Sequence, residues 1–147
     1  MKKIALSLLM TATFSTFAVA SDYASKDEAQ ALAQKAAAYL QDNGMEKAAA
    51  AFQTQGSEWF DRDLYVFVMQ KDAGVLDSHG AKPALVGKNL LGLKDTDGKL
   101  FVKELAAIET EGWVDYNWQN PTTSAIEAKS TYCTAVDASL VCVGAYQ

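Results

Sequence analysis

Residues 63–70, "DLYVFVMQ", constrain the fold of this chain more than any other stretch. The stretch contains an unbroken apolar run, "LYVFVM", whereas a half-exposed strand would alternate apolar and polar residues. Successive side chains of a strand point to opposite faces, so both faces of this strand are apolar. Such a strand needs cover on both sides, which predicts a central strand between two layers of structure.

A helical layer for one of these faces precedes the central strand. Ser25 and Glu28 form a capping box, the pattern that opens a helix, and apolar residues then recur at helical spacing. The sequence "DNG" at residues 42–44 ends this helix. A second helix is predicted in "MEKAAAAFQTQ", which Gly56 closes. Their many alanines give both helices a slim surface that suits close packing on a sheet.

The remainder of the chain predicts further strands and one short helix. "VLDSH" is a second strand, and residues 98–108 form a short amphipathic helix. Three more strands are predicted in "GWVDYNW", "AIEAKSTYCTAV" and "SLVCVGAY". A long crossover lies between the second and third strands, and hairpins join the others. The predicted class is α+β, with an antiparallel sheet of about five strands and the N-terminal helices on one face.

Residues 1–20, "MKKIALSLLMTATFSTFAVA", have the pattern of a secretory signal peptide. Two lysines precede an uncharged apolar run, which ends in an A-x-A cleavage pattern. A membrane anchor is the alternative, but the run is short and rich in Ser and Thr. We expect cleavage near Ala20 and a bacterial protein in the periplasm or outside the cell. Residues 21–147 then form one domain.

The charge of this domain limits its partners. The whole chain has a formal net charge of −5, and removal of a leader with two lysines and no acid makes it −7. The lysines and arginines do not cluster, which argues against a nucleic acid or an anionic membrane surface as partner. No later stretch is apolar enough to span a bilayer, so no membrane insertion is expected after cleavage.

Two cysteines, Cys133 and Cys142, are expected to form a disulfide in an oxidising compartment. Two buried thiols are the alternative. A hairpin with Asp137 and Ala138 as its two-residue loop would place the cysteines opposite each other. The Cα atoms of such a non-hydrogen-bonded pair lie about 4.5 Å apart, at the short end of the range for disulfides.

The order of these elements resembles the Cache family of extracytoplasmic sensor domains, specifically the single Cache type 2 branch. The resemblance rests on "DLYVFVMQKDAGVLDSHGAKPALVGKNLLGLKDTDGKLFVKEL", "GWVDYNWQNP", "AKSTY" and "VGAY". It implies a PAS-like fold, with a long N-terminal helix on one sheet face and a pocket for small molecules, often short carboxylates, on the other. Family members usually report to chemoreceptors or histidine kinases. The family commonly has His-Pro where this chain has His79-Gly80, and no signalling module follows, so we expect a stand-alone secreted Cache domain.

The stretch "GWVDYNWQNP" combines rings with polar residues, and strand alternation separates them. One face carries Val114, Tyr116 and Trp118, and the other carries Trp113, Asp115 and Asn117. We assign Tyr116 and Trp118 to the pocket, because the polar residues suit a more solvated face. Plain core packing is the alternative for both rings.

Four further residues are candidates for the pocket: Tyr65, His79, Lys129 and Tyr132. Lys129 would offer a charge-assisted hydrogen bond to a ligand carboxylate, with an ordinary surface lysine as the alternative. Lys129 and Tyr132 have opposite parity, so they share a face only if a bulge intervenes. Tyr65 is a candidate wall or core residue, and His79 is a rim or structural residue.

The sequence favours a binding protein over an enzyme. No local signature of a catalytic constellation or a cofactor loop is present, and one histidine with two paired cysteines provides no metal cluster. "DTDG" at residues 95–98 resembles the start of a calcium loop, but Lys99 and Ala106 occupy ligand positions, so a turn is predicted. We expect a sensor for a short-chain organic carboxylate that acts through a membrane receptor or kinase. The alternative is an accessory interaction subunit of such a receptor, with a filled pocket and no ligand.

Overall fold

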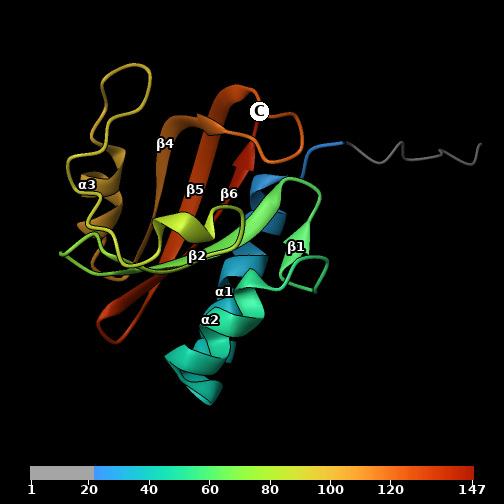
Figure 1. Cartoon of the computed structure of the whole chain (residues 1–147), viewed down its shortest axis with the longest axis vertical. Coiled ribbons are helices and arrows are strands. Elements are labelled where there is room, and N and C mark those ends of the chain that lie inside the picture. The colour runs from blue at the N-terminus through green and yellow to red at the C-terminus, as the bar shows by residue number, and fades with distance from the viewer. Residues whose placement is uncertain (1–21) are drawn as a thin grey trace, which may run out of the picture.

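One antiparallel sheet organises residues 22–147, the part of the chain that this computed structural model describes (Figure 1). The predicted signal peptide lies outside the described residues. The strands run in the order β1-β2-β6-β5-β4, and β3 also pairs with β2. Their bounds are β1 (Phe60–Asp61), β2 (Leu64–Gln70), β3 (Leu76–His79), β4 (Glu111–Gln119), β5 (Ile126–Val136) and β6 (Ser139–Tyr146).

Two N-terminal helices, α1 (Lys26–Asn43) and α2 (Met45–Gln53), cover one face of the sheet. The predicted capping box is present: the Glu28 N–H donates to Ser25 Oγ at 3.2 Å, and the Ser25 N–H donates to the Glu28 carboxylate at 2.7 Å. Small buried alanines let α1 lie close to the strands. Within residues 22–147, none of the helices combines the length and the hydropathy that a membrane crossing requires.

The central strand β2 is buried on both faces, as its sequence predicts. Leu64, Val66 and Val68 pack in the core under the helices. Tyr65, Phe67 and Met69 pack in a second core on the opposite face.

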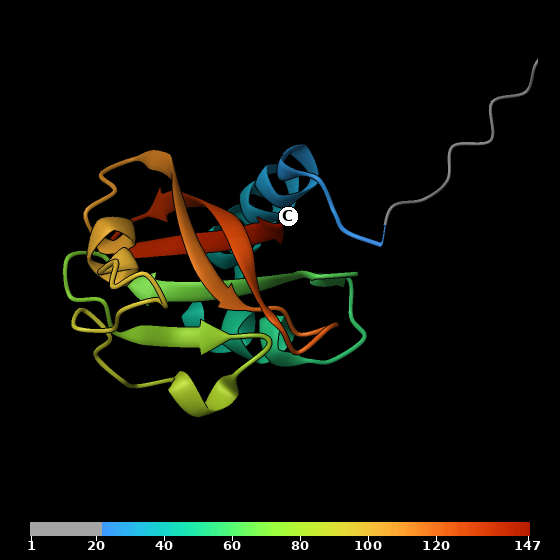
Figure 2. The same cartoon turned by 90° about the horizontal axis from the view of Figure 1, so that it is seen from above.

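The second core is closed by the crossover that joins β3 to β4. It carries a short 3-10 helix, η1 (Pro83–Leu85), and the helix α3 (Phe101–Ala106), which is shorter than the predicted helix over residues 98–108. Figure 2 shows α1 and α2 on one side of the sheet and the crossover on the other. The predicted α+β class and the long N-terminal helix on one sheet face are therefore confirmed. Sequence patterning missed β1, because two residues are too few to show alternation.

The β5–β6 hairpin has the predicted register. Val136 pairs with Ser139 and Cys133 pairs with Cys142, across a loop in which Asp137 has φ 52°. The two cysteines form a disulfide with Cα atoms 4.1 Å apart, and both are fully buried.

A buried carboxylate joins the two ends of the domain. Asp63 is fully buried, and its oxygens accept the backbone N–H groups of Ala24 at 2.6 Å and Tyr146 at 2.9 Å. The segment before α1 is thereby fixed to the last strand.

We expect replacement of both cysteines by alanine to lower the free energy of unfolding by about 2–4 kcal/mol, because the unfolded chain loses a cross-link. Urea titration of the oxidised wild type and the double variant, followed by circular dichroism, measures the difference. Wild type unfolded with a reductant present is the control and should approach the variant. Equal midpoints for all three samples would contradict a stabilising disulfide.

Candidate ligand-binding site

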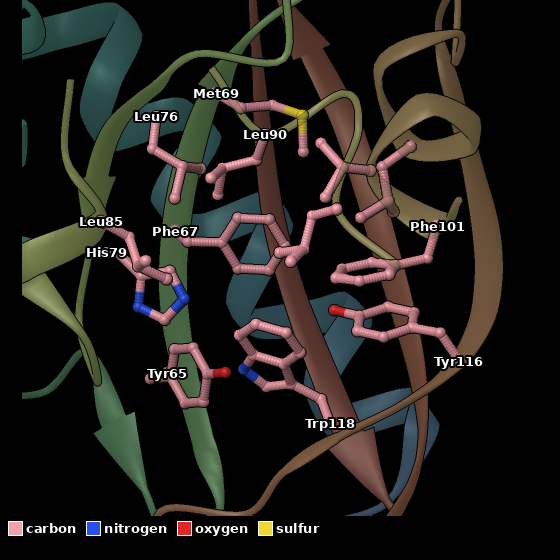
Figure 3. Close-up of a pocket in the computed structure, with 13 residues that line it drawn as sticks. Tyr65, Phe67, Met69, Leu76, His79, Leu85, Leu90, Phe101, Tyr116 and Trp118 are labelled. Atoms are coloured by element: carbon pink, nitrogen blue, oxygen red, sulfur yellow. The ribbon is translucent and has the colours of Figure 1, made fainter. Parts of the chain in front are cut away.

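A small cavity of about 30 Å³ lies between the sheet and the crossover, on the face away from α1 and α2. Figure 3 shows that its wall changes in character from one end to the other. The polar end has Tyr65, His79 and Trp118, and the apolar end has Met69, Leu76 and Leu90, with Phe67, Phe101 and Tyr116 between them. A largely apolar wall with a few placed polar groups is typical of a small-molecule site.

The alternation in β4 places Tyr116 and Trp118 at the cavity, as predicted from their parity. The Tyr116 ring stacks on Phe101 with centroids 4.1 Å apart, and its hydroxyl lies 2.9 Å from Thr131 Oγ1. Trp113 points to the opposite face, where its ring contacts Tyr132 and remains 36% exposed. The rings of "GWVDYNWQNP" are thus divided between the two faces of the sheet.

His79 is the last residue of β3, and its imidazole lies in the cavity wall. Nδ1 accepts the backbone N–H of Lys82 at 2.9 Å, and the ring stacks on Phe67. Burial is the main cause that lowers the pKa of His79 to about 3, so the ring is neutral at neutral pH. Since Nδ1 is an acceptor, the proton of the neutral ring is on Nε2. One ring nitrogen faces the cavity in Figure 3, which makes His79 a hydrogen-bond donor for a ligand.

The structure gives a reason for Gly80 after His79, where the Cache family commonly has proline. The Gly80 N–H donates to the carbonyl oxygen of Val66 at 2.9 Å, a bond that proline cannot make. A Cβ at this position would lie 3.0 Å from the backbone oxygen of Phe52 and from the Phe60 ring. Glycine therefore lets the chain turn close to α2 while β3 remains paired.

Lys129 is almost completely buried, at 1% exposure. Its Nζ donates to the Tyr65 hydroxyl at 2.8 Å and lies 4.1 Å from the centroid of the Tyr65 ring and 4.7 Å from that of Tyr146. None of the ion pairs among the described residues includes it. Burial lowers the pKa of Lys129 well below its ordinary value, while the negative charge of Asp63 opposes this effect. A buried amine of this kind has a polar neighbour but no counter-ion.

Lys129 does not itself line the cavity, contrary to the expectation from sequence. Tyr65 lines it, and the hydroxyl of Tyr65 connects the cavity wall to the amine. That hydroxyl lies 3.4 Å from the Tyr146 hydroxyl, which donates to the Gln119 carbonyl oxygen at 2.7 Å. A separation of 3.4 Å is long for an O–H···O bond, so the hydrogen of Tyr65 is available to a ligand.

Tyr132, the remaining candidate, lies on the other side of the sheet. Its ring packs in the helix-side core, and its hydroxyl donates to Glu111. β5 continues its pairing through this region without a bulge, so the opposite parity of Lys129 and Tyr132 separates them. No ligand role is proposed for Tyr132.

The crossover supplies cavity residues that sequence reasoning missed: Leu85, Leu90, Leu93, Phe101, Val102 and Leu105. A helical period was visible only for the last three, and the loop leucines have no periodic signal.

The loop that carries Asp95 is a turn, as predicted. Asp95 accepts the backbone N–H groups of Asp97, Lys99 and Asn117. Within residues 22–147, no three His, Cys, Asp or Glu side chains are grouped so that they could hold a metal ion.

Comparison with known proteins identifies the family. A model of the Cache domain matches residues 12–143, and the chain therefore belongs to the Cache domain family. This is a family of non-catalytic sensor domains, in agreement with the expectation of a binding protein rather than an enzyme. No curated protein matches the chain.

Solved structures with the same fold include chemotaxis sensors. A methyl-accepting chemotaxis protein from Vibrio parahaemolyticus is 24% identical, with a TM-score of 0.71 over 82% of this chain and 87% of that one. A periplasmic sensor domain of a chemotaxis protein has 24% identity and a TM-score of 0.59, over 82% and 88% of the two chains. A third structure, described as the basis for carboxylic acid recognition by a Cache chemosensory domain, has 20% identity and a TM-score of 0.66, over 82% and 91%.

The side chain of Lys129 passes over β6 on its way to Tyr65, and Gly144 on β6 leaves the space for it. A Cβ there would overlap Lys129 Cε and Thr131 Oγ1. We expect Gly144→Ala to displace Lys129 and to lower the free energy of unfolding by about 1–3 kcal/mol, the usual effect of overpacking. Urea unfolding measures the loss.

Gly112→Ala on β4 is the matched control, because its Cβ would lie 3.7 Å from Ile108, at ordinary contact distance. Gly112→Ala should leave the stability close to that of wild type. An equal loss in both variants would show that the Gly144 result reflects a general intolerance of alanine in the sheet.

Proposed function

We propose that this chain is an extracytoplasmic sensor domain whose cavity binds a short-chain monocarboxylate. The observation that carries the proposal is a buried lysine without an acidic partner, one hydroxyl away from a ring-lined cavity. A buried cationic group is costly unless an anion compensates it. The carboxylate of a ligand would be that anion.

The polar end of the cavity has the donors that a carboxylate requires. Tyr65 can donate its hydroxyl hydrogen, and His79 can donate from Nε2. The indole nitrogen of Trp118 points toward the same end (Figure 3). Lys129, behind the Tyr65 hydroxyl, supplies the compensating charge.

The remainder of the cavity limits the ligand's size and class. One water needs about 10–15 Å³ on this measure of volume, so a cavity of about 30 Å³ favours a small ligand. No Asp or Glu is among the described residues that line it, so the ammonium of an amino acid would lack a partner. The apolar walls match an alkyl chain, and an acid of two to four carbons best combines these properties.

Family membership supports the sensor role. One protein of the same fold is described as recognising carboxylic acid, and two as parts of chemotaxis proteins. We assign the chain to the single Cache type 2 branch and propose that it reports to a membrane receptor or histidine kinase. The disulfide and the leader sequence favour the periplasm or the cell exterior, with cleavage near Ala20.

A thermal-shift screen of sodium acetate, propionate and butyrate tests the proposal. At about 100 times its dissociation constant, a bound acid should stabilise the folded protein by about 2.7 kcal/mol. Lys129→Met should abolish this shift, because it removes the compensating charge. Lys47→Met is the matched control, since Lys47 is exposed on α2 and contacts Asn43, and it should retain the full shift.

The absence of a shift with all three acids would overturn the proposed function. The alternative, an accessory interaction subunit with a filled pocket, would then predict capture of a membrane receptor or sensor kinase in a pull-down.

A further inference from the structure

We propose that the ligand-free protein holds Lys129 as a neutral amine and that carboxylate binding is accompanied by protonation of this amine, so the protein takes up the equivalent of an undissociated acid. The inference rests on the proposed function and adds the proton to it. It starts from the surroundings of one atom, Lys129 Nζ.

The groups around Nζ provide no ion-pair partner for a charge on the amine. Its one hydrogen-bond partner among the described residues is the neutral Tyr65 hydroxyl, and its other close neighbours are aromatic rings. The titratable and charged groups on the surrounding elements are Asp63, Tyr65, His79, Lys82, Tyr116 and Tyr146.

The one acidic side chain among these groups, Asp63, is engaged elsewhere. Burial raises the pKa values of Tyr65, Tyr116 and Tyr146, so their hydroxyls remain protonated. His79 is neutral. Both oxygens of Asp63 accept backbone N–H groups, and no ion pair joins Asp63 to Lys129. Lys82 adds a positive charge.

Aromatic rings cannot replace an anion for a desolvated ammonium. A ring offers a desolvated cation a weaker interaction than the hydration that the cation loses on leaving water. Burial therefore lowers the pKa of Lys129 in the ligand-free protein, which favours the neutral amine.

A ligand carboxylate reverses this balance. When the carboxylate accepts the Tyr65 hydrogen, its negative charge lies one hydroxyl away from Nζ, and a nearby opposite charge favours the ammonium form. The balanced step is carboxylate plus neutral amine plus one proton from solvent, giving a carboxylate and an ammonium, and the Tyr65 hydroxyl between them keeps its own proton. The net charge of the ligand and the amine together is zero after binding, and the neutral amine carries no charge before it, which avoids an uncompensated ion in either state.

The unliganded protein provides the first test. The unfolded chain has an ordinary lysine pKa of about 10.5, and the folded chain has a lower one, so the unfolded state binds more protons between the two values. Stability of the wild type relative to Lys129→Met should therefore increase with pH, by up to about tenfold in the folding equilibrium constant per pH unit. Urea unfolding of both proteins from about pH 6 to about pH 9 measures it, and a difference that is independent of pH overturns the proposal.

Calorimetry of acetate, propionate or butyrate binding provides the second test. We expect uptake of about one proton per ligand, seen as different apparent enthalpies in phosphate and in Tris, and a dissociation constant that rises up to about tenfold per pH unit. His79→Gln should bind more weakly and still take up the proton, which distinguishes Lys129 from His79 as the acceptor.

Each outcome is decisive. A pH-dependent stability difference together with proton uptake supports the proposal. Binding without proton uptake overturns it and leaves the proposed function intact. Failure of all three acids to bind overturns both, whatever the stability difference.

Discussion

The burial of β2 on both faces is the constraint on which the rest of this structure depends. An uninterrupted apolar strand cannot be stable with one face in water, so it needs α1 and α2 on one side and the crossover on the other. The crossover has to travel from β3 at one edge of the sheet to β4 at the opposite edge. It is loop for most of its length. The cavity lies between leucines of this crossover and the rings of Tyr65 and Phe67.

The position of Lys129 follows from the same arrangement. β5 is an interior strand between β6 and β4, and Lys129 on its crossover-side face is almost completely buried. Gly144 on the neighbouring strand leaves a channel for the aliphatic part of the side chain, which ends at the Tyr65 hydroxyl. An amine in this position costs stability, which is the reason to regard it as part of a binding site.

The candidate site was partly predictable. Strand parity predicted which side of β4 faces the cavity, because alternation is fixed by backbone geometry. Parity also predicted that Lys129 and Tyr132 lie on opposite faces unless a bulge intervenes. The relation between Lys129 and Tyr65 was not predictable, because these residues lie 64 positions apart and meet across β6. The proton position on His79 likewise depends on a contact with the loop that follows it.

The sequence by itself determined the local features: the capping box of α1, the two-sided strand β2, the hairpin that pairs Cys133 with Cys142, and the faces of β4. These features depend on residues close together in the chain or on strict periodicity, so a pattern of residues specifies them. Only the tertiary structure decided the strand order, the leucines that close the cavity and the burial of Lys129 without a counter-ion. Burial and charge compensation are properties of neighbours in space, and residues distant in sequence supply those neighbours.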